Sequence, residues 1–228
     1  MTTRALTIFD TTVGKKAVMA GTGAILLTFV VGHMLGNLQV YLGPKAMNEY
    51  AALLQSNPTL LWAVRLVMFV TLSLHVLTAT QLYLLNRSAR PVRYRMKTSV
   101  TTSYAARTMV IGGPLVAAYL AYHLAHLTGG FTKGLGYPHL PLDANGLPDV
   151  FHNVVMSFQI PWCVALYVVA QMLLGLHLYH GAWSLFQSLG INHRRYNETL
   201  RSAASAIGVA VAVGFLAVPV GVVLGYVK

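Results

Sequence analysis

Five long apolar stretches alternate with shorter polar segments along the chain, at about residues 16–41, 60–85, 104–128, 157–186 and 202–227. A helix rises about 1.5 Å per residue, so each stretch is long enough to cross the roughly 30 Å hydrocarbon core of a bilayer. The pattern therefore predicts an all-α integral membrane protein. We expect a single membrane domain over residues 1–228, built as a bundle of five transmembrane helices.

Glycine, proline and polar residues separate the stretches. Residues 45–59 form a polar connection, and residues 129–149, rich in Gly and Pro, predict an external loop. The fourth apolar run begins near Phe151, and Pro161 is expected to mark the start of its membrane portion. Inside the third, Gly112-Gly113-Pro114 predicts either a kink or close packing against a neighbouring helix.

Composition supports a membrane location. Hydrophobic residues make up 56% of the chain and charged residues 9%, with a mean hydropathy of +0.60. All five acidic residues lie outside the apolar stretches or at their edges, which argues against an ion-coupled pump or transporter. The lone cysteine, Cys163, cannot form an internal disulfide and is expected to be a buried packing residue.

The net charge of +11 is expected to reflect membrane topology rather than nucleic-acid binding. With five spans, twelve Lys and Arg fall on one side of the membrane and four on the other. Basic residues accumulate on the cytoplasmic side. The amino terminus is therefore expected in the cytoplasm and the carboxyl terminus outside.

Four of the stretches contain a histidine deep in an apolar environment, where such a residue needs a partner or a function. His33 and His123 come about 26 and 28 Å from the inner starts of their helices, so both lie toward the outside. His75 and His177 come about 21 and 30 Å from the outer starts of theirs, so both lie toward the cytoplasm. Helical rise thus predicts an outer pair and an inner pair.

Two imidazoles that face each other across a bundle suit a six-coordinate haem iron, because the porphyrin supplies the other four nitrogens. Such a haem carries electrons and leaves no open position for oxygen chemistry. A single histidine of this kind is usually an interhelical hydrogen-bonding residue, but four histidines paired in depth favour haem ligation. Zinc is less favoured, because the deep positions offer neither cysteine nor carboxylate ligands.

Two stretches carry a second histidine, His126 and His180, three residues after the first. Each pair shares a helix face, so periodicity alone does not choose between its members. A flat macrocycle needs neighbouring positions with small side chains, such as Gly36 near the first histidine. Gly181 lies four residues after His177 and so favours His177 over His180.

These residues resemble the membrane cytochrome b subunit of succinate:quinone oxidoreductases, in the five-span, two-haem class shared by succinate dehydrogenases and fumarate reductases. The resemblance covers nearly the whole chain. It rests on Val31-Gly32-His33-Met34-Leu35-Gly36-Asn37, on Ser73-Leu74-His75, on Gly113 ten residues before His123, and on His177-x-x-x-Gly181-x-Trp183-Ser184 followed by Leu189-Gly190.

The resemblance implies two haem b groups with four axial ligands, an outer pair His33 and His123 and an inner pair His75 and His177. Further residues are expected to contact the haem propionates or neighbouring helices: His126, His180, Arg65 and Arg107. For Arg65, extension of the side chain to the outer interface is an equal alternative. Two sets of polar residues are candidates for a quinone site, Asn37, Gln39 and Glu49 near the outer haem, and Tyr83, Asn86 and Trp183 near the inner face.

The resemblance also implies a complex in the cytoplasmic membrane. A flavoprotein would oxidise succinate, an iron–sulfur subunit would relay the electrons, and this subunit would deliver them to a quinone, with menaquinone favoured by the family. The subunit would not oxidise succinate alone, because it has neither a dinucleotide fingerprint nor a cysteine cluster. Its cytoplasmic basic segments, residues 87–97 and Arg194-Arg195, are candidate docking surfaces.

Two alternatives stay open. The chain could instead be the cytochrome b subunit of another respiratory dehydrogenase, of the hydrogenase or formate dehydrogenase type. It could also be a transport or structural membrane protein without haem, whose histidines serve packing.

Overall fold

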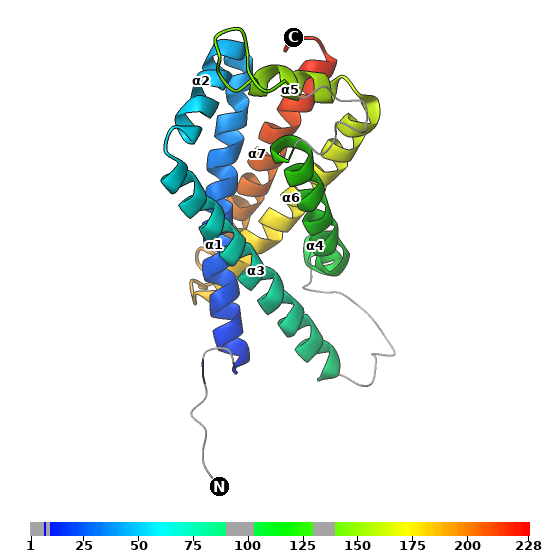
Figure 1. The fold of residues 1–228 in the computed structure, drawn as a ribbon. Helices are drawn as coiled ribbons and strands as arrows, with labels where there is room; N and C mark the ends of the chain where they lie inside the picture. Colours follow the sequence, from blue (N-terminus) through cyan, green and yellow to red (C-terminus); the bar gives the residue numbers. More distant parts are fainter. Residues whose placement is uncertain (1–6, 8–9, 90–102, 130–139) are drawn as a thin grey trace.

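The computed structural model describes residues 7, 10–89, 103–129 and 140–228 (Figure 1). Within these ranges the chain is helical, apart from turns and an isolated β-bridge between Leu142 and Pro148. The helices are α1 (Thr12–Asn37), α2 (Pro44–Gln55), α3 (Pro58–Ser88), α4 (Tyr104–His123), α5 (Val150–Phe158), α6 (Pro161–Ser188) and α7 (Asn197–Val223). A 3₁₀ turn, Leu38–Leu42, extends α1, and a π turn, Leu124–Thr128, extends α4.

Five of the described helices are long and apolar enough to cross a membrane: α1 with its 3₁₀ turn, α3, α4 with its π turn, α6 and α7. This confirms the all-helical prediction and indicates a membrane protein. The kind of membrane and the sides on which the termini lie stay predictions. Residues 90–102, which hold most of the predicted docking segment, and residues 130–139 of the predicted loop lie outside the described ranges.

Local sequence explains where the spanning helices begin. The hydroxyl of Thr11 accepts a hydrogen bond from the Gly14 amide, and the Asn57 carbonyl oxygen accepts one from Leu60, each at 3.0 Å. Ser103 caps α4 in the same way. Such caps satisfy amides that have no partner within the helix. Pro161 occupies the first turn of α6, where the missing N–H costs nothing, so it does start the membrane portion as expected.

Two features of the connections were not predicted from the sequence. The polar connection 45–59 contains the twelve-residue helix α2, and the fourth stretch, expected from residue 157, is split at Pro161 into α5 and α6. Both short helices lie at the end of the molecule that carries the carboxyl terminus (Figure 1). We call this the outer end and the end where α1 begins the inner end, following the predicted orientation.

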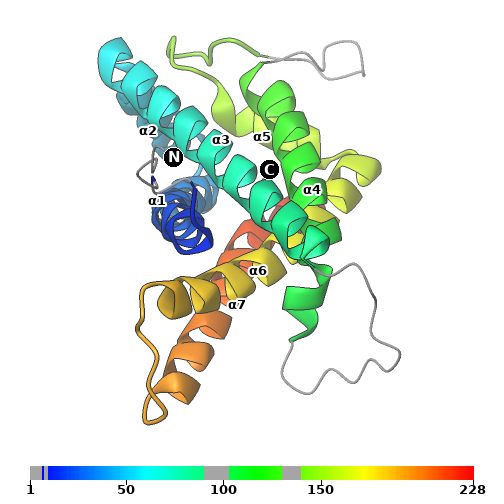
Figure 2. The ribbon, with the colours of Figure 1, turned by 90° about the horizontal axis from the view of Figure 1, so that it is seen from below.

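The spanning helices are arranged around α1, α6 and α7. α6 and α7 pack most closely, because glycines face each other: a Cβ on Gly208 would lie 2.6 Å from the Gly175 carbonyl oxygen. Small residues allow such backbone approach in membranes. α3 packs mainly against α1, and α4 against α6 (Figure 2). As a result α3 and α6 lie near each other in the bundle but make few direct contacts.

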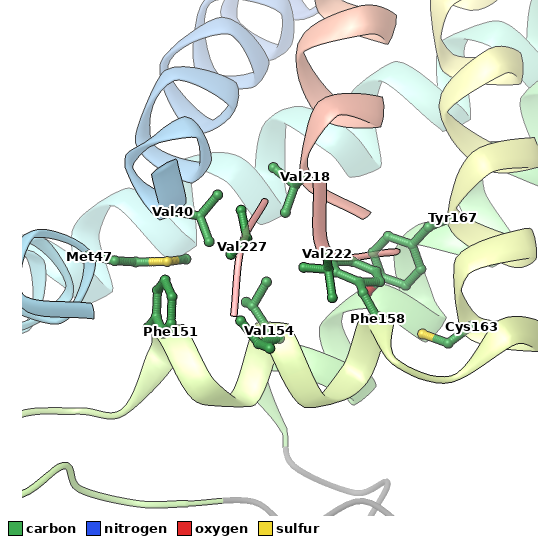
Figure 3. Packing of buried hydrophobic residues seen from close by; sticks show 11 residues of the cluster. Val40, Met47, Phe151, Val154, Phe158, Cys163, Tyr167, Val218, Val222 and Val227 are labelled. Atoms are coloured by element: carbon green, nitrogen blue, oxygen red, sulfur yellow. The ribbon is translucent and has the colours of Figure 1, made fainter. Parts of the chain in front are cut away.

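A hydrophobic cluster closes the outer end. It includes Met47 from α2, Phe151 from α5, Val222 from α7 and Cys163 from α6, and the view of the cluster shows Tyr167 beside Phe158 at its edge (Figure 3). Cys163 is fully buried, as expected of a packing residue. The short helices therefore bind the outer ends of the spans together.

Helix α4 has two irregular features. It continues through Pro114, and a Cβ on Gly112 or Gly113 would meet no atom of the described residues within 4 Å, so of the two predicted alternatives these glycines do not show the close packing. Its last turn widens from α to π directly after His123, and the π turn contains His126. π turns occur frequently at functional sites.

Candidate functional site

The outer pair consists of His33 on α1 and His123 on α4. Their ring centroids lie 5.9 Å apart, with an angle of 76° between the ring planes. Phe29 stacks on His33 at 5.6 Å, and Phe215 of α7 approaches the same ring at 5.8 Å. The structure therefore brings together the two histidines that helical rise placed toward the outside, in an apolar and aromatic setting.

The inner pair consists of His75 on α3 and His177 on α6. Their centroids are 6.3 Å apart and their planes make an angle of 63°. The His75 Nδ1 atom lies 3.1 Å from the hydroxyl of Thr22, and a Cβ on Gly23 would lie 3.5 Å from the His75 ring. The Nδ1 atom of His177 is buried and has no hydrogen-bond partner among the described residues.

The two pairs occupy different depths. Thr22, which contacts His75, comes eleven residues before His33 on α1, and Tyr167, which contacts His123, comes ten residues before His177 on α6. At 1.5 Å per residue both helices separate the pairs by about 15 Å. The two measures agree, so the two pairs lie at different heights in the bundle, while the assignment of one pair to the cytoplasmic side stays a prediction.

The spacing within each pair fits a shared metal ion. An imidazole nitrogen binds a metal at about 2.0 Å and its ring centre lies about 1.2 Å further away, so two axial imidazoles place their centres about 6.4 Å apart. The observed separations are 5.9 and 6.3 Å. No group of three or more His, Cys, Asp or Glu suited to a metal ion occurs in the described ranges, but a haem needs only two protein ligands.

The glycines near the histidines differ in what surrounds them. A Cβ on Gly32, Gly113 or Gly181 would meet no atom of the described residues within 4 Å, and Gly32 and Gly181 are exposed. Gly36 is different, because a Cβ there would lie 2.9 Å from the ring of Tyr50 on α2. The expectation that Gly36 provides clearance for a macrocycle was therefore wrong, and it instead accommodates α2.

The structure separates the roles of the second histidines. His126 is 3% exposed and engages both ring nitrogens, Nδ1 with the Tyr167 hydroxyl at 2.9 Å and Nε2 with the Ser157 hydroxyl at 3.1 Å. His126 therefore serves interhelical contact, one of the two roles expected for it. His180 Nε2 lies 3.3 Å from Ser184, one turn further along its own helix.

The two arginines lie at the ends of their helices. Arg65 is exposed, and its guanidinium lies over the Trp62 ring at 4.9 Å, a cation–π contact at the outer end of α3. This arrangement matches extension to the interface better than a propionate contact. Arg107 is exposed in the first turns of α4, toward the inner end.

The quinone candidates remain in two separate groups. Asn37 donates its amide to the His33 carbonyl at 2.9 Å, Gln39 belongs to the 3₁₀ turn, and Glu49 pairs with Lys45 at the exposed surface. These residues lie at the outer end. Tyr83 and Asn86 lie near the end of α3, and Trp183 is on α6 under the guanidinium of Arg201 at 5.8 Å.

Sequence reasoning missed three hydroxyl-bearing neighbours of the histidines: Thr22, Tyr167 and Ser157. Tyr167 lies 3.2 Å from His123 and 2.9 Å from His126. Helical period alone gives no signal for a contact between α4 and α6. Helical rise along the fourth apolar stretch, applied to Tyr167, would have placed its side chain at the depth of the outer histidine pair.

Comparison with known proteins adds no assignment: no protein-family model, curated protein sequence or solved structure matches this chain.

Proposed function

We propose that this protein is a di-haem cytochrome b membrane subunit that carries electrons to a quinone, and that it anchors a succinate:quinone oxidoreductase. One observation carries the proposal. Four helices supply one histidine each, and these form two pairs at two depths. The ring centroids lie 5.9 Å apart in the outer pair and 6.3 Å apart in the inner pair. A packing role requires neither the matched separations nor the arrangement in depth.

The surroundings of the inner pair are compatible with a large, flat, apolar ligand. His75 and His177 approach each other although α3 and α6 do not pack extensively, and open space lies beside Gly181. All four histidines are only partly buried within the chain. When bound, haem supplies one-electron transfer without an open coordination position. The protein's own contribution is to hold each imidazole, exclude water and separate the two sites along α1 and α6.

The choice of complex rests on the resemblance stated above. At the inner end, Arg194 and Arg195 are exposed in the loop between α6 and α7, and Arg201 lies beside Tyr179 at 3.3 Å. These cations suit an acidic surface of a cytoplasmic iron–sulfur subunit, which would receive electrons from a flavoprotein. Quinone, with menaquinone favoured, is the proposed acceptor.

Haem content and reduced-minus-oxidised spectra of the purified complex test the proposal. The expected wild type holds two low-spin haem b per chain. His177→Ala should lose the inner haem because it removes one axial ligand, whereas His180→Ala, the matched control one turn away, should keep both. Wild-type protein without a b-type band would refute haem binding, and loss of haem from His180→Ala alone would show that the ligand assignment is wrong.

Co-purifying subunits test the choice of complex. A flavoprotein and an iron–sulfur protein with succinate:quinone activity are expected. A nickel or molybdenum catalytic subunit would instead assign the chain to another respiratory dehydrogenase, while the two haems would remain.

A further inference from the structure

A hydrogen-bonded chain of side chains extends from the outer pair toward the outer end of the molecule. It runs from His123 on α4 to Tyr167 on α6, returns to His126 in the π turn, and ends at Ser157 on α5. The successive donor–acceptor distances are 3.2, 2.9 and 3.1 Å. Side chains from α6, the π turn and α5 are therefore linked, one after another, to His123, a ligand of the proposed outer haem.

The far end of the chain determines the position of every proton in it. The Ser157 hydroxyl donates to the backbone carbonyl of Asn153 at 2.7 Å, so its oxygen must accept from His126. A neutral imidazole carries one N–H, which here must be on Nε2. Burial favours this neutral form, because a charge in an apolar interior is costly. The Nδ1 atom of His126 is then an acceptor.

The same reasoning continues to the ligand. The Tyr167 hydroxyl donates to Nδ1 of His126, so the Tyr167 oxygen accepts from Nδ1–H of His123. Nε2 of His123 is left without a hydrogen. Only an unprotonated nitrogen can bind a metal, so the chain fixes both the tautomer and the ring orientation that a haem ligand requires.

The inner site contains a shorter version. Thr22 donates its hydroxyl to the carbonyls of Val18 and Met19, at 2.8 and 3.1 Å, so its oxygen accepts from Nδ1–H of His75. This again leaves Nε2 unprotonated. One histidine of each pair thus has an oriented tautomer. Its partner at the inner site, His177, has a buried Nδ1 without a hydrogen-bond partner among the described residues.

We propose that Tyr167 is a positioning residue for the outer haem, with His126 and Ser157 fixing its hydroxyl, and that Thr22 has the equivalent role at the inner haem. This inference rests on the proposed function. Accepting the Nδ1–H bond makes an imidazole a stronger electron donor to iron. Each hydroxyl therefore stabilises the oxidised form of its own haem and lowers that haem's reduction potential.

Spectroelectrochemical titration of both haems in the purified complex tests the inference. Tyr167→Phe should raise the reduction potential of the outer haem alone, increasing its reduced-to-oxidised ratio at a fixed applied potential by about threefold or more. Thr22→Val should do the same to the inner haem alone. Tyr122→Phe removes a neighbouring hydroxyl that contacts Cys163, and it should shift neither haem.

The outcomes are distinguishable. Two haems with wild-type potentials in both Tyr167→Phe and Thr22→Val would overturn the inference while leaving the proposed function intact, whereas a wild type without haem would overturn the proposed function itself. If Tyr167→Phe does not retain the outer haem, Ser157→Ala replaces it. That variant leaves Tyr167 in place and frees the tautomer of His126, so a smaller rise of the outer potential is expected, and an unchanged potential would overturn the inference.

Discussion

Asn48 on α2 is fully buried where α2 meets α5 and the loop that precedes α5. Its amide donates to Asp143 at 3.0 Å and to Asp149 at 3.3 Å, and its carbonyl oxygen accepts from the Phe151 amide at 3.0 Å. One side chain thus binds three groups of the segment 143–151, which is far from Asn48 in the sequence. Its position makes Asn48 the main polar link across the outer end.

We expect Asn48→Ala to lower the free energy of unfolding by about 2–3 kcal/mol, because it leaves the buried Phe151 amide without its acceptor and removes one hydrogen bond from the buried Asp149 carboxylate. Thermal unfolding in detergent measures this. Glu49→Gln, at the adjacent exposed position, should change stability little. Equal unfolding temperatures for the two variants would contradict the assigned role of Asn48.

Asp143 gives the same junction a pH dependence. The Asn48 amide, followed by the backbone amide of Leu147, holds the pKa of the Asp143 carboxyl below its ordinary value of 3.8. A lowered folded-state pKa stabilises the fold above the ordinary value, and this contribution is lost as pH falls through the lowered value. Below pH 4 the unfolding temperature should therefore fall more steeply in wild type than in Asp143→Asn. Parallel acid profiles would exclude the contribution.

At the scale of elements, the contact of α6 with α7 depends on paired glycines. Gly208→Ala would place a Cβ 2.6 Å from the carbonyl oxygen of Gly175, and backbone cannot move aside as a flexible side chain can. We expect a loss of about 1–3 kcal/mol in stability, measured by thermal unfolding. Gly21→Ala on α1 is the matched control, because a Cβ there meets nothing within 4 Å. A Gly208→Ala protein as stable as Gly21→Ala would argue against close packing of these helices.

The spanning helices and the grouping of the four histidines into two pairs follow from the sequence, because hydropathy and helical rise depend only on residues along one helix. α2 was not predicted, since its polar residues resemble a loop and its apolar Met47 belongs to a cluster built from several elements distant in the sequence. The contact of Tyr167 with both His123 and His126 was also missed. It requires the π turn and the facing of α4 with α6, and neither depends on local sequence alone.

For the whole molecule, the distribution of basic residues predicts which end faces the cytoplasm. Asn145 and Asn192 are both exposed and lie at the outer and inner ends respectively. In a Cys163→Ala background, Asn145→Cys should react with a membrane-impermeant maleimide in intact cells. Asn192→Cys should react only after permeabilisation. The opposite pattern would reverse the topology and place the outer histidine pair near the cytoplasm.

The π turn after His123 has a consequence for chain length. A regular helix that acquires one extra residue accommodates it by widening a single turn in this way. Loss of any one residue from 124 to 128 would restore the regular turn and rotate the part beyond the deletion by about 100° relative to the helix before it. A single deletion in this turn would therefore turn the side chains beyond it, such as that of Leu127, toward a different side of the helix.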